Sequence, residues 1–338
     1  MKSRLTAELI RVSAMGIILF GCKDTTLHVM KWAKKRGLFI HLITLTPDKA
    51  AEQKVAGYED LSVYTDLFSS IHLVDRYDLK SSLDIEYISS LDCNVGLCMG
   101  WQRLIPRSVL DEIPFGVYGM HGSSQNLPYG KGRSPMNWSI IEGRSWFFTN
   151  LFSYRAGVDD GPILDTSCFS IQEADTAETL HYKNTTAFLK LLDSNLDKIL
   201  SNKVLLREQE KGVDSFYPKR EPENSQIDWY DSIHNIDRLI KAVSKPFNGA
   251  FSHYGKCKVT IFRASIFYVD LEEHYYKDSK IGTICDVYPN GKFLVKCNGG
   301  VIIVHEFESE FEISESLVLK SEKQCKAFAR NRYGFFDI

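Results

Sequence analysis

The chain has 338 residues, of which 44% are hydrophobic and 25% are charged, and it carries a formal net charge of −2 with a pI near 6.5. This composition excludes wholesale disorder and predicts a sizeable core, and the length favours two domains over one. No long run of like charge occurs, which disfavours a broad polyanion-binding surface but leaves a local basic patch open.

The cysteines and the N-terminal region indicate a reducing compartment. The eight cysteines are scattered and form neither a C-x-x-C pair nor a zinc-binding spacing with histidine, so we expect reduced thiols and no metal site. The longest weakly polar stretch, residues 12–22, is too short to span a bilayer and ends in charged residues rather than a cleavage site. We therefore predict a cytoplasmic protein without membrane attachment.

The first half of the chain alternates continuous apolar runs with helical patterns. These runs predict strands at residues 16–20, 39–45, 71–74 and 95–99, with a further strand near Val117. Because the runs do not alternate apolar with polar residues, we expect an α/β fold with a mostly parallel, Rossmann-like sheet and helices on both faces. Neither G-x-G-x-x-G nor a P-loop motif occurs, which disfavours a dinucleotide or P-loop site.

Two later helices of this half are marked by their ends or by their length. Ser134 as N-cap and Pro135 as first helical residue predict a helix that stops at Gly143. A helical pattern over residues 176–200 closes the region. We predict that the first domain extends over residues 1–207.

The second half begins with a polar segment, residues 208–224, which two prolines interrupt and which we predict to be a linker. Residues 225–320 are predicted to form a small β-rich, OB-like domain that begins with an amphipathic helix at 226–244. Its short strands are expected at residues 258–262, 282–287, 293–296 and 301–304, with a hairpin turn at 289–291. Residues 321–338 form a tail without an assigned structure.

The segment from 115 to 163 carries the residues that suggest chemistry. Several glycines surround a single histidine, His121, and Asp159 and Asp160 lie in a turn before a strand-like run. A histidine and a carboxylate on neighbouring loops are the minimum set for proton transfer at neutral pH. Taken alone, however, a loop histidine is more often structural than catalytic, and Asp-Asp-Gly is a common turn sequence.

A resemblance adds to this pattern. The stretch from His121 to Gly143 (HGSSQNLPYGKGRSPMNWSIIEG), followed by GVDDGPI at 157–163, resembles the formyltransferase family that uses N10-formyltetrahydrofolate. Residues 218–229 and 242–251 look like the start of the C-terminal domain in the amino-arabinose and methionyl-tRNA branches of that family. The similarity covers roughly residues 16–310, and several motifs in the right order are more specific than any single one.

The resemblance implies how protons move during the reaction. His121 matches a histidine that assists proton transfer while an acceptor amine attacks the formyl carbon. Asp159 matches an aspartate that orients this histidine and helps to remove protons from the nitrogen. The first domain, residues 1–207, is then the catalytic domain.

The oxyanion site departs from the family pattern. An asparagine that stabilises the oxyanion stands two positions before the histidine in the family, but this chain has Gly119 there and a loop two residues longer after His121. Gln125 or Asn126 could supply the missing amide. We favour Asn126, because Pro128 restricts the residues that precede it, although Asn126 as a plain turn residue is an equal alternative.

The resemblance also implies where the folate donor binds. Main-chain groups of the loop at Arg103, Leu104 and Ile105, and of Gly157 and Val158, are expected to hydrogen-bond the pterin. Without the resemblance, these positions would be plain sheet-end residues.

Three classes of acceptor compete: nucleotide-linked amino sugars, initiator methionyl-tRNA, and small amines such as glycinamide ribonucleotide. The glycinamide branch usually lacks a second domain of this length. Proteins that bind transfer RNA neutralise phosphates, which the slightly acidic chain disfavours, and the signature at 249–251 is closer to the sugar branch. Candidate phosphate contacts in either case are Lys131, Arg133, Lys219 and Arg220.

We therefore predict formyl transfer from N10-formyltetrahydrofolate to an amino sugar carried on a nucleotide. A methionyl-tRNA formyltransferase and a non-catalytic family member that kept the fold are the alternatives. The sequence leaves open the sugar, its nucleotide and the oligomeric state, including a homodimer.

Overall fold

The computed structural model describes residues 16–321 and Phe336. Residues 1–15 and nearly all of the predicted tail at 321–338 lie outside this part. The chain divides into two compact units. The first consists of the chain through Lys131 with Phe148–Phe169 and Tyr182–Asp214, and the second of Gly132–Phe147, Ser170–His181 and the chain from Ser215 onward. The predicted linear boundaries at 207 and 224 stay a prediction.

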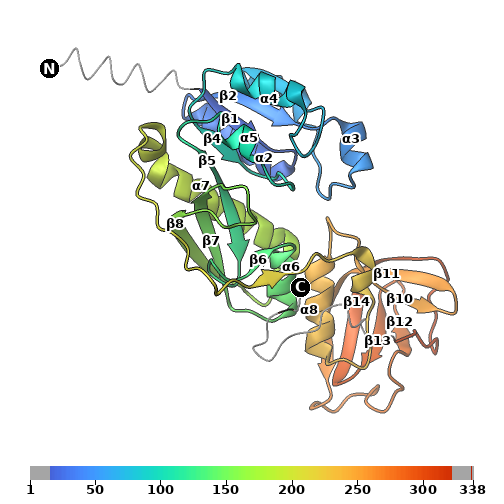
Figure 1. The fold of residues 1–338 in the computed structure, drawn as a ribbon. Helices are drawn as coiled ribbons and strands as arrows, with labels where there is room; N and C mark the ends of the chain where they lie inside the picture. The colour runs from blue at the N-terminus through green and yellow to red at the C-terminus, as the bar shows by residue number, and fades with distance from the viewer. Residues whose placement is uncertain (1–15, 322–335, 337–338) are drawn as a thin grey trace. The chain divides into compact units, whose positions relative to one another are not determined.

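A seven-stranded sheet organises the first unit, and its order is β3-β2-β1-β4-β5-β7-β8 (Figure 1). The strands from β3 to β5 in this order run parallel, whereas β7 runs antiparallel to β5. The mostly parallel sheet predicted from the apolar runs is therefore confirmed. The strands are β1 (Gly16–Phe20), β2 (Phe39–Thr44), β3 (Ser70–Leu73), β4 (Gly96–Cys98), β5 (Val117–Ser123), β7 (Trp146–Ser153) and β8 (Ile163–Ser170).

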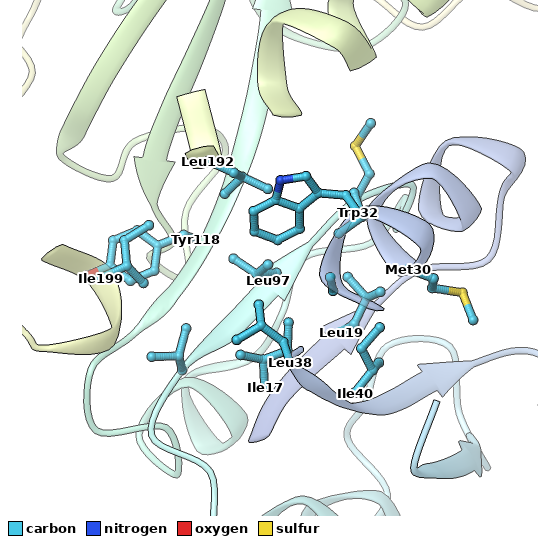
Figure 2. Packing of buried hydrophobic residues seen from close by; sticks show 14 of the residues in the cluster. Ile17, Leu19, Met30, Trp32, Leu38, Ile40, Leu97, Tyr118, Leu192 and Ile199 are labelled. Atoms are coloured by element: carbon cyan, nitrogen blue, oxygen red, sulfur yellow. The ribbon is translucent and has the colours of Figure 1, made fainter. Parts of the chain in front are cut away.

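Helices cover both faces of this sheet, and the alternation of side chains along β1 explains why. Ile17 and Leu19 enter one core, with residues of α2 and α7, while Ile18 and Phe20 enter a second core with residues of α3, α4 and α5. Figure 2 shows the first core, in which Trp32 of α2 lies close to Leu192 of α7. The helices are α2 (Asp24–Lys35), α3 (Pro47–Glu52), α4 (Ser82–Ser89), α5 (Arg107–Leu110) and α7 (Ala177–Leu200), with 3-10 turns η1 (Leu61–Val63) and η2 (Thr65–Leu67).

A polar contact fixes α2 within the first core. The Trp32 indole Nε1 donates a hydrogen bond to Asp193 Oδ1 at 2.6 Å, so the one polar atom of a buried ring has a partner. Arg36 at the end of α2 also pairs with Asp193. The long helix α7 is thereby joined to α2.

The second unit contains a five-stranded antiparallel sheet in the order β10-β11-β14-β13-β12. This sheet confirms the predicted β-rich C-terminal part, and helix α8 lies against its strand β11 (Figure 1). The strands are β10 (Ala250–Tyr254), β11 (Cys257–Val269), β12 (Ile284–Val287), β13 (Phe293–Cys297) and β14 (Gly300–Ser309). The remaining elements are β6 (Lys131–Gly132), β9 (Phe216–Tyr217), α6 (Pro135–Ile141), η3 (Pro222–Ser225) and α8 (Ile233–Val243).

Helix α8 is shorter than the helix predicted over 226–244. Ile227 donates its N–H to the carbonyl of Phe251 at 2.8 Å, and Gln226 and Phe251 form a parallel bridge, so this stretch pairs with an edge strand instead of coiling. The helix begins after Ser232, whose hydroxyl accepts a hydrogen bond from the N–H of Asn235 at 3.2 Å. Pairing with β10 therefore overrides the helical pattern before this cap.

Helix α6 begins at Pro135 as predicted, but without the expected side-chain cap. Ser134 occupies the N-cap position and Pro135 follows it, but Ser134 has a left-handed backbone (φ 55°) and no side-chain cap. Its hydroxyl instead accepts a hydrogen bond from the N–H of Arg220 at 3.2 Å. A long-range contact thus takes the place of the local one.

We expect Leu19→Ala to destabilise the first unit by about 2–5 kcal/mol, because Leu19 is fully buried and truncation leaves a cavity between the sheet and α2. Urea unfolding followed by tryptophan fluorescence measures this loss. Leu83→Ala is the matched control, since Leu83 on α4 is 62% exposed and its loss should change stability by less than about 0.5 kcal/mol. Equal destabilisation by both variants would contradict the assigned core.

Candidate active site

His121 lies where β5 extends past the carboxyl end of β4. The pairing of β4 with β5 ends at Cys98 and Gly119, and β5 continues to Ser123 with only β7 beside it, where His121 stands opposite Asn150. The carboxyl ends of parallel strands are where such sheets bind ligands. The imidazole is 6% exposed, and its Nε2 lies 2.7 Å from the carbonyl oxygen of Gly130. His121 is therefore held firmly at the predicted edge.

Asp159 reaches His121 from the turn between β7 and β8. Its Oδ2 lies 3.3 Å from His121 Nδ1, and its side chain is 21% exposed. Gly161 allows this turn to close, because a Cβ at that position would lie 1.7 Å from the carbonyl oxygen of Ser153. The structure thus brings together the two residues that the sequence proposed for proton transfer.

The two contacts of the His121 ring fix what it can do. A carbonyl oxygen only accepts hydrogen bonds, so Nε2 carries a proton in its contact with Gly130. Nδ1 then faces the carboxylate of Asp159, also an acceptor. A proton on Nδ1 would make this contact a charge-assisted hydrogen bond.

The last residue of the predicted first domain, Arg207, and the first two residues of the predicted linker, Glu208 and Gln209, hold the turn that carries Asp159. Arg207 exchanges two backbone hydrogen bonds with Ile163, each 2.8 Å long. Glu208 pairs with Arg155 through two hydrogen bonds of 2.6 and 2.9 Å. The side-chain amide of Gln209 donates to the carbonyls of Asp159 and Gly161, both at 2.7 Å. Sequence reasoning missed this support, because nothing in a polar linker indicates partners some fifty residues away.

The predicted folate loop follows β4, and its side chains differ in how far they are exposed. Ile105 is buried at 1% exposure, whereas Leu104 is 52% exposed. The Arg103 guanidinium lies over the Tyr77 ring, 4.9 Å from its centroid, and donates to Gln53 Oε1 at 3.2 Å. The side chains of Arg103, Tyr77 and Gln53 line a cavity of about 330 Å³. Its other lining residues are Lys49, Glu52, Asp75, Arg76 and Asp78.

The other predicted folate-binding residues, Gly157 and Val158, belong to the Asp159 turn itself. A Cβ at Gly157 would lie 2.2 Å from a carboxylate oxygen of Asp160, so a larger residue there would displace the Asp160 side chain. Val158 is 41% exposed. The main-chain contacts of these residues and of the 103–105 loop with a pterin stay predictions.

Two family models match the chain, one in each half of the sequence. The model for formyl transferases matches residues 15–193, and the model for the C-terminal domain of formyl transferases matches residues 219–314. The first match alone spans more than half of the chain.

The chain belongs to the formyl transferase family.

Relatives of this formyl transferase show how far the likeness extends. It is 32% identical over 182 residues to the bifunctional polymyxin resistance protein ArnA of Wigglesworthia glossinidia brevipalpis, a match that covers 54% of this chain but only 28% of the relative. The chain therefore spans less than a third of that curated relative.

Solved structures share the fold of this formyl transferase. The N-formyltransferase from Helicobacter canadensis, in complex with folinic acid and dTDP-3-aminofucose, matches with a TM-score of 0.60 at 16% identity, over 86% of this chain and 98% of that one. A variant of HypX from Aquifex aeolicus matches with a TM-score of 0.64 at 16% identity, over 88% of this chain and 45% of that one.

Asn126 of this formyl transferase lies in a turn, as one of the two interpretations expected. Its carbonyl accepts a hydrogen bond from the N–H of Tyr129 at 3.0 Å, across the cis Leu127–Pro128 bond. Its side-chain Oδ1 is buried and has no hydrogen-bond partner among the described residues. A catalytic role for Asn126 stays a prediction.

The basic residues proposed as phosphate contacts divide into buried and exposed ones. Lys131 is 4% exposed and pairs with Asp214. Arg220 lies over the Trp138 ring, 4.8 Å from its centroid, and burial lowers the pKa of its guanidinium to about 10. Arg133 and Lys219 are exposed, and Lys219 pairs with Glu221 at 2.6 Å.

No helix in the described part of the chain is both long enough and apolar enough to cross a membrane. Within residues 16–321, no three His, Cys, Asp or Glu side chains are grouped so that they could hold a metal ion.

We expect Gln209→Glu to loosen the Asp159 turn, because a carboxylate oxygen replaces the amide N–H groups that face two carbonyls. Loss of these half-buried hydrogen bonds should lower the local opening free energy by about 1–3 kcal/mol. Hydrogen exchange of the amides of Ser153 and Ile163, which are bonded across the turn and to Arg207, measures this opening. Glu208→Gln is the control, since it weakens only an exposed ion pair. Equal exchange in both variants would show that the hydrogen bonds of Gln209 do not hold the Asp159 turn closed.

Proposed function

We propose that this protein transfers the formyl group of N10-formyltetrahydrofolate to the amino group of a nucleotide-linked amino sugar. The observation that carries the proposal is the His121–Asp159 contact at 3.3 Å, found at the carboxyl edge of the sheet in a member of the formyl transferase family. A buried ring with an adjacent carboxylate is suited to take a proton from an amine that becomes an amide.

In this proposal the acceptor amine attacks the formyl carbon, and His121 receives the proton that the nitrogen loses. Asp159 stabilises the resulting imidazolium and fixes the ring plane. Tetrahydrofolate leaves as its N10 regains a proton. Both reacting groups bind in one site, which converts a bimolecular encounter into a positioned reaction.

The folate donor is proposed to lie between the 103–105 loop and the Asp159 turn. Both loops expose an apolar side chain, Leu104 at 52% and Val158 at 41%, which is suited to the flat pterin ring. Backbone groups in the same loops offer the hydrogen bonds that a pterin edge requires. The complex of the Helicobacter canadensis protein with folinic acid supports a folate donor.

The amino-sugar acceptor is supported by charge and by relatives. The chain carries a net charge of −2, which suits a small nucleotide better than a transfer RNA, whose binding relies on neutralising many phosphates. The same Helicobacter canadensis structure contains dTDP-3-aminofucose. A methionyl-tRNA acceptor is the alternative.

We expect the protein, incubated with N10-formyltetrahydrofolate and a panel of nucleoside-diphosphate-linked amino sugars, to add one formyl group to at least one of them. Mass spectrometry of the sugars detects the product. Charged initiator transfer RNA should stay unmodified in a parallel reaction, because the chain lacks the net positive charge of a polyanion binder. Formylation of the transfer RNA without turnover of any sugar would show that the acceptor is methionyl-tRNA and not an amino sugar.

His121→Asn and Asp159→Asn should each lower kcat by about a hundredfold to ten-thousandfold, because a positioned acid or base contributes on that scale. Steady-state kinetics with the formylated sugar as product measures the loss, and circular dichroism checks folding. Asp160→Asn is the matched control, since Asp160 is the exposed neighbour in the same turn. Normal turnover of either site variant would remove that residue from the mechanism.

A further inference from the structure

Tyr154 fills the space beside Gly119. A Cβ built on Gly119 would lie 2.5 Å from Cε1, 2.6 Å from Oη and 2.7 Å from Cζ of Tyr154, and these are its three nearest atoms. The backbone of Gly119 is not left-handed, so conformation does not demand a glycine there. Glycine at position 119 instead leaves room for the phenol.

The hydroxyl of Tyr154 lies on the same face of β5 as His121. Side chains alternate along a strand, so positions 119 and 121 share a face and lie about 6.6 Å apart along it. The backbone N–H of Tyr154 donates to the carbonyl of Val117 at 2.7 Å, and its ring stacks on Phe152 with centroids 4.9 Å apart. These contacts fix the direction in which the hydroxyl points.

The hydroxyl is a donor with a weak resting partner. Burial raises the pKa of Tyr154 well above its usual value, so the phenol keeps its proton at neutral pH. At rest it hydrogen-bonds to the thiol of Cys98, the residue paired with Gly119 across the sheet. Sulfur is a poor acceptor, so an oxygen that bears negative charge would compete successfully for this O–H.

We propose that Tyr154 donates the hydrogen bond that stabilises the oxyanion at the formyl carbon. This inference rests on the proposed function. When the amine nitrogen bonds to the formyl carbon, the carbonyl π pair moves to oxygen, and the amine proton passes to His121. Collapse of the intermediate restores the carbonyl and breaks the bond to N10 of the folate, which takes up a proton. A fixed donor near the oxygen lowers the barrier at its highest point.

The same geometry favours Tyr154 over Asn126 for this role. The unpaired buried atom of Asn126 is Oδ1, which is an acceptor, so only its Nδ2 could donate to an oxyanion. Tyr154 instead presents a proton donor on the face that carries His121. Asn126 then remains a turn residue, whose carbonyl closes the loop onto Tyr129.

The first experiment compares Tyr154→Phe with Tyr118→Phe. Tyr154→Phe removes only the O–H and keeps the ring on Phe152, so we expect kcat to fall by about a hundredfold to a thousandfold, with the KM of both substrates and folinic-acid binding little changed. Tyr118→Phe removes a hydroxyl on the opposite face, where it donates to the Phe115 carbonyl at 2.9 Å. It should retain near-normal kcat.

The second experiment exchanges the donor. Gly119→Asn alone should be inactive or misfolded, because its side chain would collide with the Tyr154 ring. Tyr154→Ala alone should be slow, and the double variant Tyr154→Ala/Gly119→Asn should regain at least tenfold in kcat, because the new amide enters the vacated space. A structural role of Tyr154 would give no such rescue.

The outcomes separate this proposal from the proposed function. An active wild type with an equally active Tyr154→Phe variant would overturn the role of Tyr154 and leave the formyl transfer intact. A large loss of kcat in Asn126→Ala but not in Tyr154→Phe would assign the oxyanion to the longer loop. A wild type that formylates neither sugars nor transfer RNA would refute the proposed function, and the role of Tyr154 with it.

Discussion

The antiparallel pairing of β7 with β5 is the constraint on which the site depends. It places His121 opposite Asn150 and lets the turn after β7 fold back along the face of β5, so that Asp159 meets the imidazole. A shift of one residue in this register would move His121 to the opposite core. One polar pair on each face of β7 secures the register: Thr149 with Asn184, and Asn150 with Thr166.

One face of β5 therefore gathers groups with complementary tasks. Val117 packs in the core that contains residues of α3, α4 and α5. Gly119 leaves room for the Tyr154 phenol, and His121 contacts Asp159 beyond the end of β4. The strand positions beside which the proposed oxyanion donor and the proposed proton acceptor lie, 119 and 121, are thus one strand repeat apart. The sheet supplies this spacing, and the two hydrogen bonds that Gln209 donates keep the Asp159 turn closed.

The sequence predicted the parts of this arrangement that depend on local pattern. Buried parallel strands appear as apolar runs, and β1, β2 and β4 lie where those runs predicted them. Strand β7 escaped notice because Thr149 and Asn150 interrupt its apolar run, and only their distant partners explain why such residues are buried. The late start of the helix predicted over 226–244 and the turn of the Ser134 hydroxyl toward Arg220 have the same cause, since long-range pairing decides both. Gly119 drew attention as a missing side chain, but only the folded chain reveals the phenol that replaces it.

The central claim is that His121 and Asp159 act as one proton-accepting unit. The most direct test is the double-mutant cycle of kcat for His121→Asn, Asp159→Asn and the variant that combines them, measured with the amino-sugar acceptor. If the two residues act together, the combined variant should be no slower than the slower single variant. Losses that multiply, so that each substitution has its full effect in the absence of the other, would show independent roles and contradict the account.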